Sequence, residues 1–142
     1  MEDAFWDSSA LVPLCVNQPA TPVVKRLSVQ YGIAVWWATP VEMLGAFARL
    51  LRMGHMTANK QVQSQVLLER MRSGWREVPP SKELRERAER LVGRFPLKAA
   101  DAHQLAAALT WCLSRPQGRA FISGDSRLLE SARQLGFHAI KA

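Results

Sequence analysis

Four acidic residues occupy positions from which their side chains could meet: Asp7, Glu42, Asp101 and Asp125. Two of them follow short apolar runs typical of buried strands, residues 4–6 before Asp7 and residues 120–122 before Asp125. In an open parallel sheet, functional side chains lie beyond the carboxyl ends of the strands, where helices begin. We therefore expect Asp7 and Asp125 to lie at one edge of a sheet.

The other two acids fall in the first turns of predicted helices. Glu42 follows Thr39-Pro40, a typical helix start. Asp101 lies on a helical row whose other members are apolar: Leu97, Leu105, Ala108 and Cys112. This row should turn the Asp101 carboxylate inward, and a buried carboxylate needs a cation, a proton or several hydrogen-bond donors.

Each of these acids also has a purely structural explanation. The two acids after strands could cap the helices that follow them, Glu42 could complete a capping box with Thr39, and Asp101 could suit a helix N-terminus. Two observations weaken this interpretation. Ser8 and Ser126 offer hydroxyl caps without any acid, and Asp101 lies too far into its helix to be a cap.

If the four acids gather, their chemistry is restricted. Carboxylates a few ångströms apart cannot all stay ionised without a counter-charge. Oxygen ligands favour hard cations such as Mg²⁺ or Mn²⁺ over zinc. A hard metal in an acidic pocket of a basic protein is suited to phosphodiester hydrolysis, because the metal lowers the pKa of an attacking water while Lys and Arg hold the nucleic acid.

Composition agrees with an anionic partner. The chain has 19 Lys and Arg against 12 Asp and Glu, a net charge of +7, and a pI near 10.3. Nucleic acid is the commonest partner of such a protein, although charge alone is equally compatible with solubility. At 142 residues we expect one domain, residues 1–142. Two isolated cysteines, no signal-peptide pattern and no membrane-spanning apolar run predict a cytoplasmic protein.

Strands and helices are expected to alternate. Strands are predicted at residues 4–6, 33–36, 120–122 and 137–140, with an extended piece at 75–78; helices are predicted at 8–16, 21–31, 39–54, 58–72, 97–113 and 126–135, with another from 81. Thr21 and Thr39 are expected to cap their helices. The inward face of helix 39–54 is expected to consist of Val41, Leu44, Phe47, Leu50 and Leu51, and that of helix 58–72 of Val62, Val66, Leu67 and Met71. This alternation predicts an α/β sandwich with a mainly parallel sheet.

Four segments resemble the PIN-domain family, and specifically the ribonuclease toxins of VapBC-type toxin–antitoxin pairs. They are AFWDSSAL (4–11), TPVEMLGAF (39–47), LKAADAHQLAAAL (97–109) and FISGDSRLLESARQLGF (121–137). The resemblance implies a three-layer α/β/α sandwich and a homodimer. It implies that Asp7, Glu42, Asp101 and Asp125 bind Mg²⁺ or Mn²⁺, and that the Ser123 hydroxyl helps to fix the last of them.

The resemblance also implies an activity and a partner. Such proteins cleave RNA with a metal-activated water and are inhibited by a small VapB-type antitoxin. The alternative is a PIN-like module that binds RNA or protein without cutting. A receiver domain or a haloacid-dehalogenase-type phosphatase would need a second acid after the first strand, and Asp7-Ser8-Ser9 lacks it.

Several further residues are candidates for RNA contact. Trp36 and Trp37 could stack an unpaired base or pack in the core, and His103 should face away from Asp101. Phosphate contacts are plausible for five basic residues that are otherwise ordinary surface charges: Arg49, Arg52, Lys98, Arg119 and Arg127.

Overall fold

A five-stranded sheet organises the protein, whose computed structural model describes residues 1–142. Every strand is parallel to its neighbours, in the order β3-β2-β1-β4-β5. The strands are β1 (Asp3–Trp6), β2 (Gly32–Trp36), β3 (Arg76–Val78), β4 (Ala120–Ser123) and β5 (His138–Lys141). Because parallel strands require crossover connections, helices separate all five strands along the chain.

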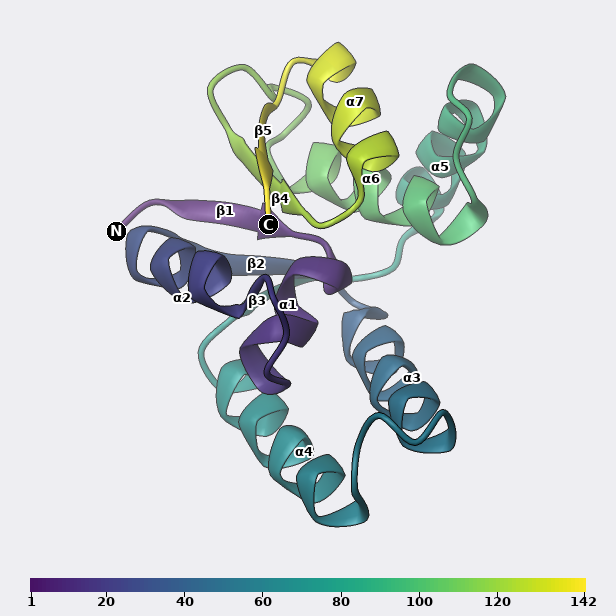
Figure 1. Ribbon diagram of the computed structural model, residues 1–142. Helices are drawn as coiled ribbons and strands as arrows, with labels where there is room; N and C mark the ends of the chain where they lie inside the picture. Colours follow the sequence, from purple (N-terminus) through teal and green to yellow (C-terminus); the bar gives the residue numbers. More distant parts are fainter.

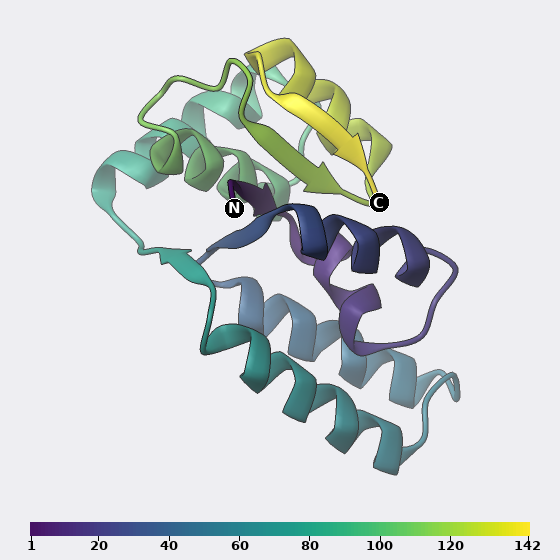
Figure 2. The same ribbon diagram turned by 90° about the vertical axis from the view of Figure 1, so that its left-hand side faces the viewer.

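Seven helices cover the two faces of the sheet (Figure 1). On one face lie α1 (Ser8–Cys15), α2 (Thr21–Gln30), α3 (Thr39–Arg52) and α4 (Ala58–Arg72), and Figure 2 shows α3 and α4 side by side as the outermost pair. On the other face lie α5 (Lys82–Arg94), α6 (Ala99–Trp111) and α7 (Ser126–Leu135). The predicted three-layer α/β/α sandwich is confirmed. None of the helices is both long and apolar enough to cross a lipid bilayer.

Two hydrophobic cores follow from the alternation of side chains along the strands. In β1, Phe5 packs into the core beneath α5, α6 and α7, whereas its neighbours Ala4 and Trp6 pack beneath α1 to α4. Phe121 of β4 stacks on Phe5 at a ring-centroid distance of 5.8 Å and meets Phe137 at 5.6 Å. Since the central strands are buried on both sides, they contain almost no polar residue until they end.

The strand order reverses between β1 and β4. The chain builds β2 and β3 on one side of β1 and then crosses over to build β4 and β5 on the other side. The backbone N–H of Asp7 donates to the carbonyl oxygen of Ile122 at 2.9 Å, so the two central strands end together. Ligands of open α/β sheets bind at such a reversal, beyond the carboxyl ends of the strands. The fold therefore places Asp7 and Asp125 at its natural binding crevice.

Two predicted helix caps are displaced by one residue. The N-caps of α2 and α3 are Ala20 and Ala38, and the threonines that follow are the first helical residues. The buried Thr21 hydroxyl donates to the carbonyl oxygen of Pro13 at 2.7 Å, which ties α2 to α1. Thr39 is fully buried beside α6. Both hydroxyls serve contacts between helices rather than capping.

The buried faces of α3 and α4 also differ from the expectation. Of the residues predicted to face inward, Phe47 is fully buried, whereas four are exposed: Val41, Leu44, Val62 and Val66. The other four are half-buried: Leu50, Leu51, Leu67 and Met71. The buried residues are Met43 and Phe47 on α3, and Ser64 and Leu68 on α4. The Ser64 hydroxyl donates to the carbonyl oxygen of Cys15 at 3.0 Å. Apolar residues lie on more than one side of these helices, so periodicity identified only part of the buried side.

Replacing Phe121 by alanine should strongly destabilise the fold. The substitution removes a fully buried ring from between two other aromatic rings and leaves a cavity. We expect the free energy of unfolding to fall by about 3–5 kcal/mol, measured by chemical denaturation. Val29→Ala is the control, because Val29 is 78% exposed and should change stability by less than about 0.5 kcal/mol. Equal effects of the two substitutions would contradict the described core.

Candidate functional site

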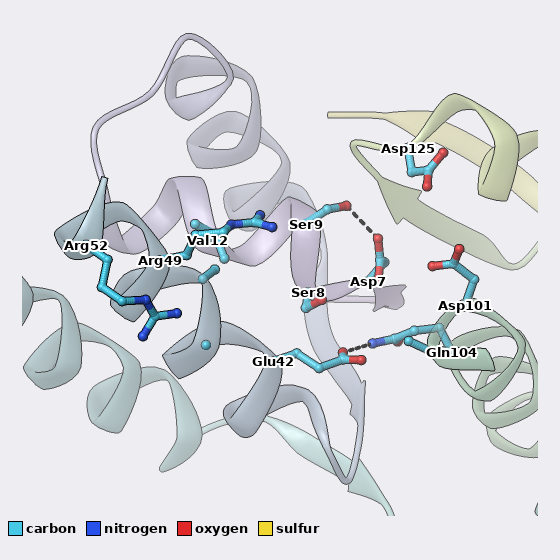
Figure 3. A pocket seen from close by; sticks show the side chains of 13 residues that line it. Asp7, Ser8, Ser9, Val12, Glu42, Arg49, Arg52, Asp101, Gln104 and Asp125 are labelled. Carbon is cyan, nitrogen blue, oxygen red and sulfur yellow. Dashed lines mark hydrogen bonds between the residues drawn. The ribbon is translucent and has the colours of Figure 1, made fainter. Parts of the chain in front are cut away.

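A cavity of about 560 Å³ opens at the reversal of the strand order (Figure 3). All four predicted acids line it: Asp7 after β1, Glu42 in the first turn of α3, Asp101 in the first turn of α6 and Asp125 before α7. Four separate elements therefore bring residues that are more than a hundred positions apart in the sequence to one place. The shared location that the sequence predicted is thus present in the structure.

Asp7 is the most buried of the four acids, with only 5% of its surface exposed. Its Oδ2 accepts hydrogen bonds from two hydroxyls, Ser9 Oγ at 2.5 Å and Ser123 Oγ at 2.9 Å. Its side chain makes no capping bond to α1, so the capping explanation does not hold for this residue. Burial raises the pKa of the Asp7 carboxyl and the Asp125 charge adds to this, whereas the two hydroxyls act in the opposite direction.

Two hydroxyl groups connect Asp7 to the segment that carries Asp125. Ser9 Oγ also accepts from the backbone N–H of Gly124 at 2.9 Å, and Ser123 Oγ accepts from the backbone N–H of Asp125 at 2.9 Å. Ser123 was expected to fix Asp125. It does contact the Asp125 backbone, but the carboxylate that its hydroxyl binds is that of Asp7. The start of α1 and the β4–α7 loop are therefore joined through one carboxylate.

Glu42 is held by a buried amide. Gln104 Nε2 donates to Glu42 Oε1 at 2.6 Å and lies 3.5 Å from the hydroxyl oxygen of Thr39 (Figure 3). Only 1% of the Gln104 surface is exposed, and its own Oε1 has no hydrogen-bond partner. Burial raises the pKa of the Glu42 carboxyl and the charges of Asp7 and Asp101 contribute, whereas the Gln104 hydrogen bond lowers it. A capping box would require the Glu42 carboxylate to bond back to the start of α3, but it bonds across to α6 instead.

Asp101 is partly buried and faces the same cavity. Burial raises the pKa of its carboxyl, the charges of Asp7 and Asp125 raise it further, and the neighbouring Lys98 lowers it. None of the four acids takes part in any of the salt bridges of the protein. The cavity therefore holds several carboxylates that oppose one another's ionisation and have no close cationic partner.

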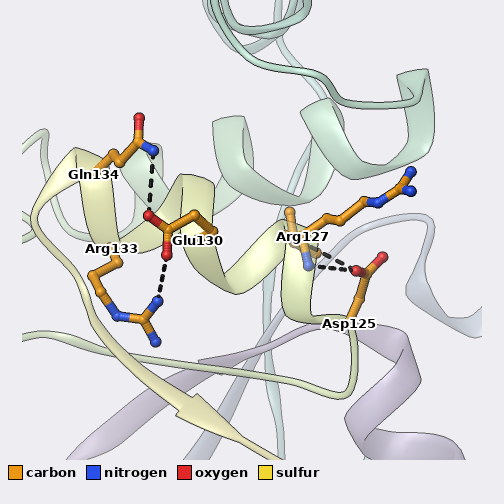
Figure 4. A network of polar contacts seen from close by, with 6 residues as sticks. Asp125, Arg127, Glu130, Arg133 and Gln134 are labelled. Carbon is orange, nitrogen blue, oxygen red and sulfur yellow. Dashed lines mark hydrogen bonds and ion pairs between the residues drawn. The ribbon is translucent and has the colours of Figure 1, made fainter.

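Asp125 has a structural role as well as its place in the cavity. Its Oδ1 accepts from the backbone N–H groups of Arg127 at 2.9 Å and Leu128 at 3.4 Å, which caps α7 (Figure 4). The Ser126 hydroxyl was expected to be available as a cap in place of Asp125, but the N-cap is Asp125 and Ser126 is the first residue of the helix. The capping explanation is thus correct for this residue, yet its second oxygen is left for the cavity.

The donor set is compatible with a hard divalent cation. It consists of carboxylate oxygens, and their mutual repulsion would be relieved by a positive ion. No three carboxylate, imidazole or thiol groups are close enough together to form a ready-made metal site. Mg²⁺ commonly takes only one or two carboxylates directly and keeps several waters, so a cavity of this kind fits it better than a closed cage would.

Basic residues border the acids on two sides. Arg49 and Arg52 of α3 line the far end of the same cavity (Figure 3). A smaller adjoining cavity of about 410 Å³ shares Asp101 and Asp125 with the first, and it is lined by Lys98 and Arg127. None of these four cations forms an ion pair. Arg119 lies elsewhere, stacked over Trp111 at 4.1 Å.

The sequence did not identify two residues that position the acids. Ser9 and Gln104 hold Asp7 and Glu42, and each had a visible signal. Ser9 follows the acid within an Asp-Ser-Ser run, and Gln104 is a polar residue three positions after Asp101, directly before the apolar run 105–109 of α6. Trp36 and Trp37 do not line the acid cavity; Trp36 is buried and Trp37 is 55% exposed.

Comparison with known proteins supports the fold. No family model and no curated protein matches the sequence. Among solved structures, the chain resembles a toxin–antitoxin complex from Klebsiella pneumoniae, with a TM-score of 0.65, 20% identity and 88% of both chains covered. It also resembles VapBC2 from Rickettsia felis bound to a DNA fragment from their promoter, with a TM-score of 0.66, 11% identity and 96% of this chain and 97% of that chain covered. The family resemblance seen in the sequence is thereby confirmed at the level of the fold.

The opposed carboxylates should make the metal-free protein less stable as the pH rises. Folding raises the pKa of Asp7 and Asp101 above the ordinary 3.8 and that of Glu42 above 4.5, so the folded protein holds more protons than the unfolded chain above about pH 4. The stability that these raised pKa values contribute is fully present at a pH below the ordinary pKa values. It is lost as the pH rises through the raised pKa values of the folded protein. In EDTA, Asp7→Asn should therefore increase Tm at pH 7 and weaken the pH dependence.

Glu130→Gln serves as the matched control. It removes the same charge from α7, where the Glu130 side chain is exposed and is not subject to the burial that raises the pKa of the cavity acids. In thermal unfolding across pH 4–8, the Tm of the control should change with pH in the same way as the Tm of the unmodified protein. An Asp7→Asn protein with a lower Tm at pH 7 and an unchanged pH profile would show that the carboxylates do not oppose one another.

Proposed function

We propose that this protein is a VapC-type toxin: a metal-dependent endoribonuclease that cleaves single-stranded or loop RNA and is neutralised by a VapB-type antitoxin. One observation carries the proposal. Asp7, Glu42, Asp101 and Asp125, delivered by four different elements, line one cavity at the strand-order reversal of a PIN-like sheet. Capping accounts for only one of them, because Asp7 makes no capping bond and Glu42 bonds to α6.

The four acids are the residues that would hold Mg²⁺ or Mn²⁺. A bound ion would neutralise charge developing on a phosphate and lower the pKa of an attacking water. The protein's own contribution is positioning. Ser9 and Ser123 fix the direction of the Asp7 carboxylate, Gln104 fixes Glu42, and the cap of α7 fixes Asp125.

An RNA substrate is supported by the charge around the acids. The net charge of +7 favours a polyanion, and unpaired cations line both cavities that meet at Asp101 and Asp125. Arg49 and Arg52 would contact phosphates on one side of the acids, and Lys98 and Arg127 would contact them on the other. Because these cations flank the acids, a strand could pass through the site, which is what internal cleavage requires.

The proposed partners rest on the resemblance and on the neighbouring structures. The two solved structures described above are a toxin–antitoxin complex and a VapBC2 complex, which supports an antitoxin for this chain. A homodimer and a cytoplasmic location belong to the same proposal.

A non-catalytic RNA- or protein-binding module is the second candidate. The observation in its favour is that no three acids are close enough to hold an ion directly. The two candidates differ in metal binding, because a pure binder has no reason to take up a divalent ion. Calorimetric titration with Mn²⁺ distinguishes them: heat of binding that is lost in Asp7→Asn supports the nuclease, and no heat supports the binding module.

Substitution of either central aspartate should abolish RNA cleavage while leaving the fold intact. We expect Asp7→Asn and Asp101→Asn each to reduce Mg²⁺- or Mn²⁺-dependent cleavage on the order of a hundred-fold or more, because each removes a charged oxygen from the metal cavity. The measurement is the rate of cleavage of a long single-stranded RNA of mixed sequence, with circular dichroism as the test of folding.

The control is again Glu130→Gln, an exposed acid paired with Arg133 at 2.7 Å on the outside of α7 (Figure 4). It should cleave like the unmodified protein, and EDTA should inactivate both. Full activity in EDTA would refute the proposal. Mapping the cleavage ends in total RNA after brief expression, against Asp7→Asn, would then identify the target.

A further inference from the structure

A second cavity lies at the same edge of the sheet, on the other side of α6 from the acids. It measures about 420 Å³, and its wall includes Trp36, Lys82, Arg85 and His103. Trp36 is the last residue of β2, and Lys82 begins the helix that follows β3. Because β2 and β3 run parallel to β1, this cavity opens at their carboxyl ends, as the acid cavity does at the end of β1.

An ordered pair of flat rings forms part of this wall. His103 stacks on Trp36 with a centroid distance of 5.8 Å and an angle of 9° between the ring planes. His103 Nδ1 lies 2.8 Å from the carbonyl oxygen of Ala99. A carbonyl oxygen only accepts, so Nδ1 carries the hydrogen and Nε2 is left for a ligand. The imidazole is thus held in one orientation by a stack and a hydrogen bond while remaining only partly buried.

The same cavity is positively charged. The Arg85 side chain makes no ion pair and no hydrogen bond, and Lys82 has only a distant contact of 4.0 Å with Glu86. No acidic residue lines the cavity. Its volume falls in the range of about 300–1,000 Å³ that is usual for small-ligand sites. A fixed aromatic plane beside an unpaired arginine and a weakly paired lysine suits a planar group joined to an anion, which is the chemistry of a nucleotide.

Consecutive residues of α6 connect the two cavities. Gln104 reaches into the acid cavity and binds Glu42, whereas His103 lies in the second cavity. We propose that Trp36, His103, Lys82 and Arg85 form a nucleotide subsite, in which a base of the RNA stacks on the His103–Trp36 pair and its phosphate contacts Arg85 and Lys82. This inference rests on the proposed function, since it assigns the second cavity to a base neighbouring the one at the acids.

The test compares RNA binding by variants of the full chain in EDTA, where no cleavage occurs. The probe is a short fluorescently labelled single-stranded RNA of mixed sequence, followed by anisotropy. His103→Ala should raise Kd about five-fold or more, the range found when a stacking side chain is removed. His103→Phe keeps a flat ring and should stay within about two-fold of the unmodified protein. Arg85→Ala should weaken binding more than Arg90→Ala, which removes an exposed charge from the same helix outside the cavity.

Each result decides the matter. A Kd for His103→Ala equal to that of the unmodified protein overturns the subsite, as do equal losses in His103→Ala and His103→Phe or in Arg85→Ala and Arg90→Ala. Cleavage with Mn²⁺ is measured in parallel to separate this inference from the proposed function. If the unmodified protein cleaves RNA but His103→Ala binds RNA with an unchanged Kd, the subsite alone is refuted. Binding that depends on His103 without any cleavage by the unmodified protein refutes the nuclease and leaves a nucleotide site.

Discussion

The hydrogen bonds to Asp7 Oδ2 are the interaction on which the rest of the site depends. Two hydroxyls, one from α1 and one from the end of β4, converge on an oxygen that is nearly removed from solvent. They lower the energy of a charge that burial and neighbouring acids would otherwise suppress. Without these two hydrogen bonds the pKa of the Asp7 carboxyl would be raised further, and the side chain would lose the contacts that fix its direction.

The sheet explains why such an arrangement arises at this place. Side-by-side parallel strands end in register, so β1 and β4 present the residues after Trp6 and Ser123 to each other. The crossover helices begin where the strands end, which brings the first turns of α1, α3 and α7 to the same edge. α6 then adds Asp101 and Gln104 from the opposite layer. The backbone therefore brings the acids together, and the hydroxyls and the amide only adjust their directions.

Much of this was predictable from the sequence. The strand-ending acids, the parallel α/β class and the 126–135 range of α7, which ends before Gly136 with its φ of +110°, follow from short-range patterns that the structure confirms. The residues that were missed depend on contacts between distant segments. Ser9 bonds to Asp7 and to the loop after β4, and Gln104, Thr21 and Thr39 find partners on other helices, which periodicity and capping rules do not describe. The predicted inward faces of α3 and α4 were only partly correct, because both helices have apolar residues on their solvent side as well.

The double use of Asp125 has a consequence for how the site can adapt. One oxygen is committed to two backbone donors of α7, so rotating the carboxylate would cost the helix its first hydrogen bonds. This corner is therefore a fixed reference point. Glu42 has a longer side chain, and its direction is fixed by a single donor, the Gln104 amide. A ligand entering the cavity would therefore meet a more firmly anchored carboxylate at Asp125 than at Glu42, and any adjustment to its size would fall mainly to the glutamate side chain.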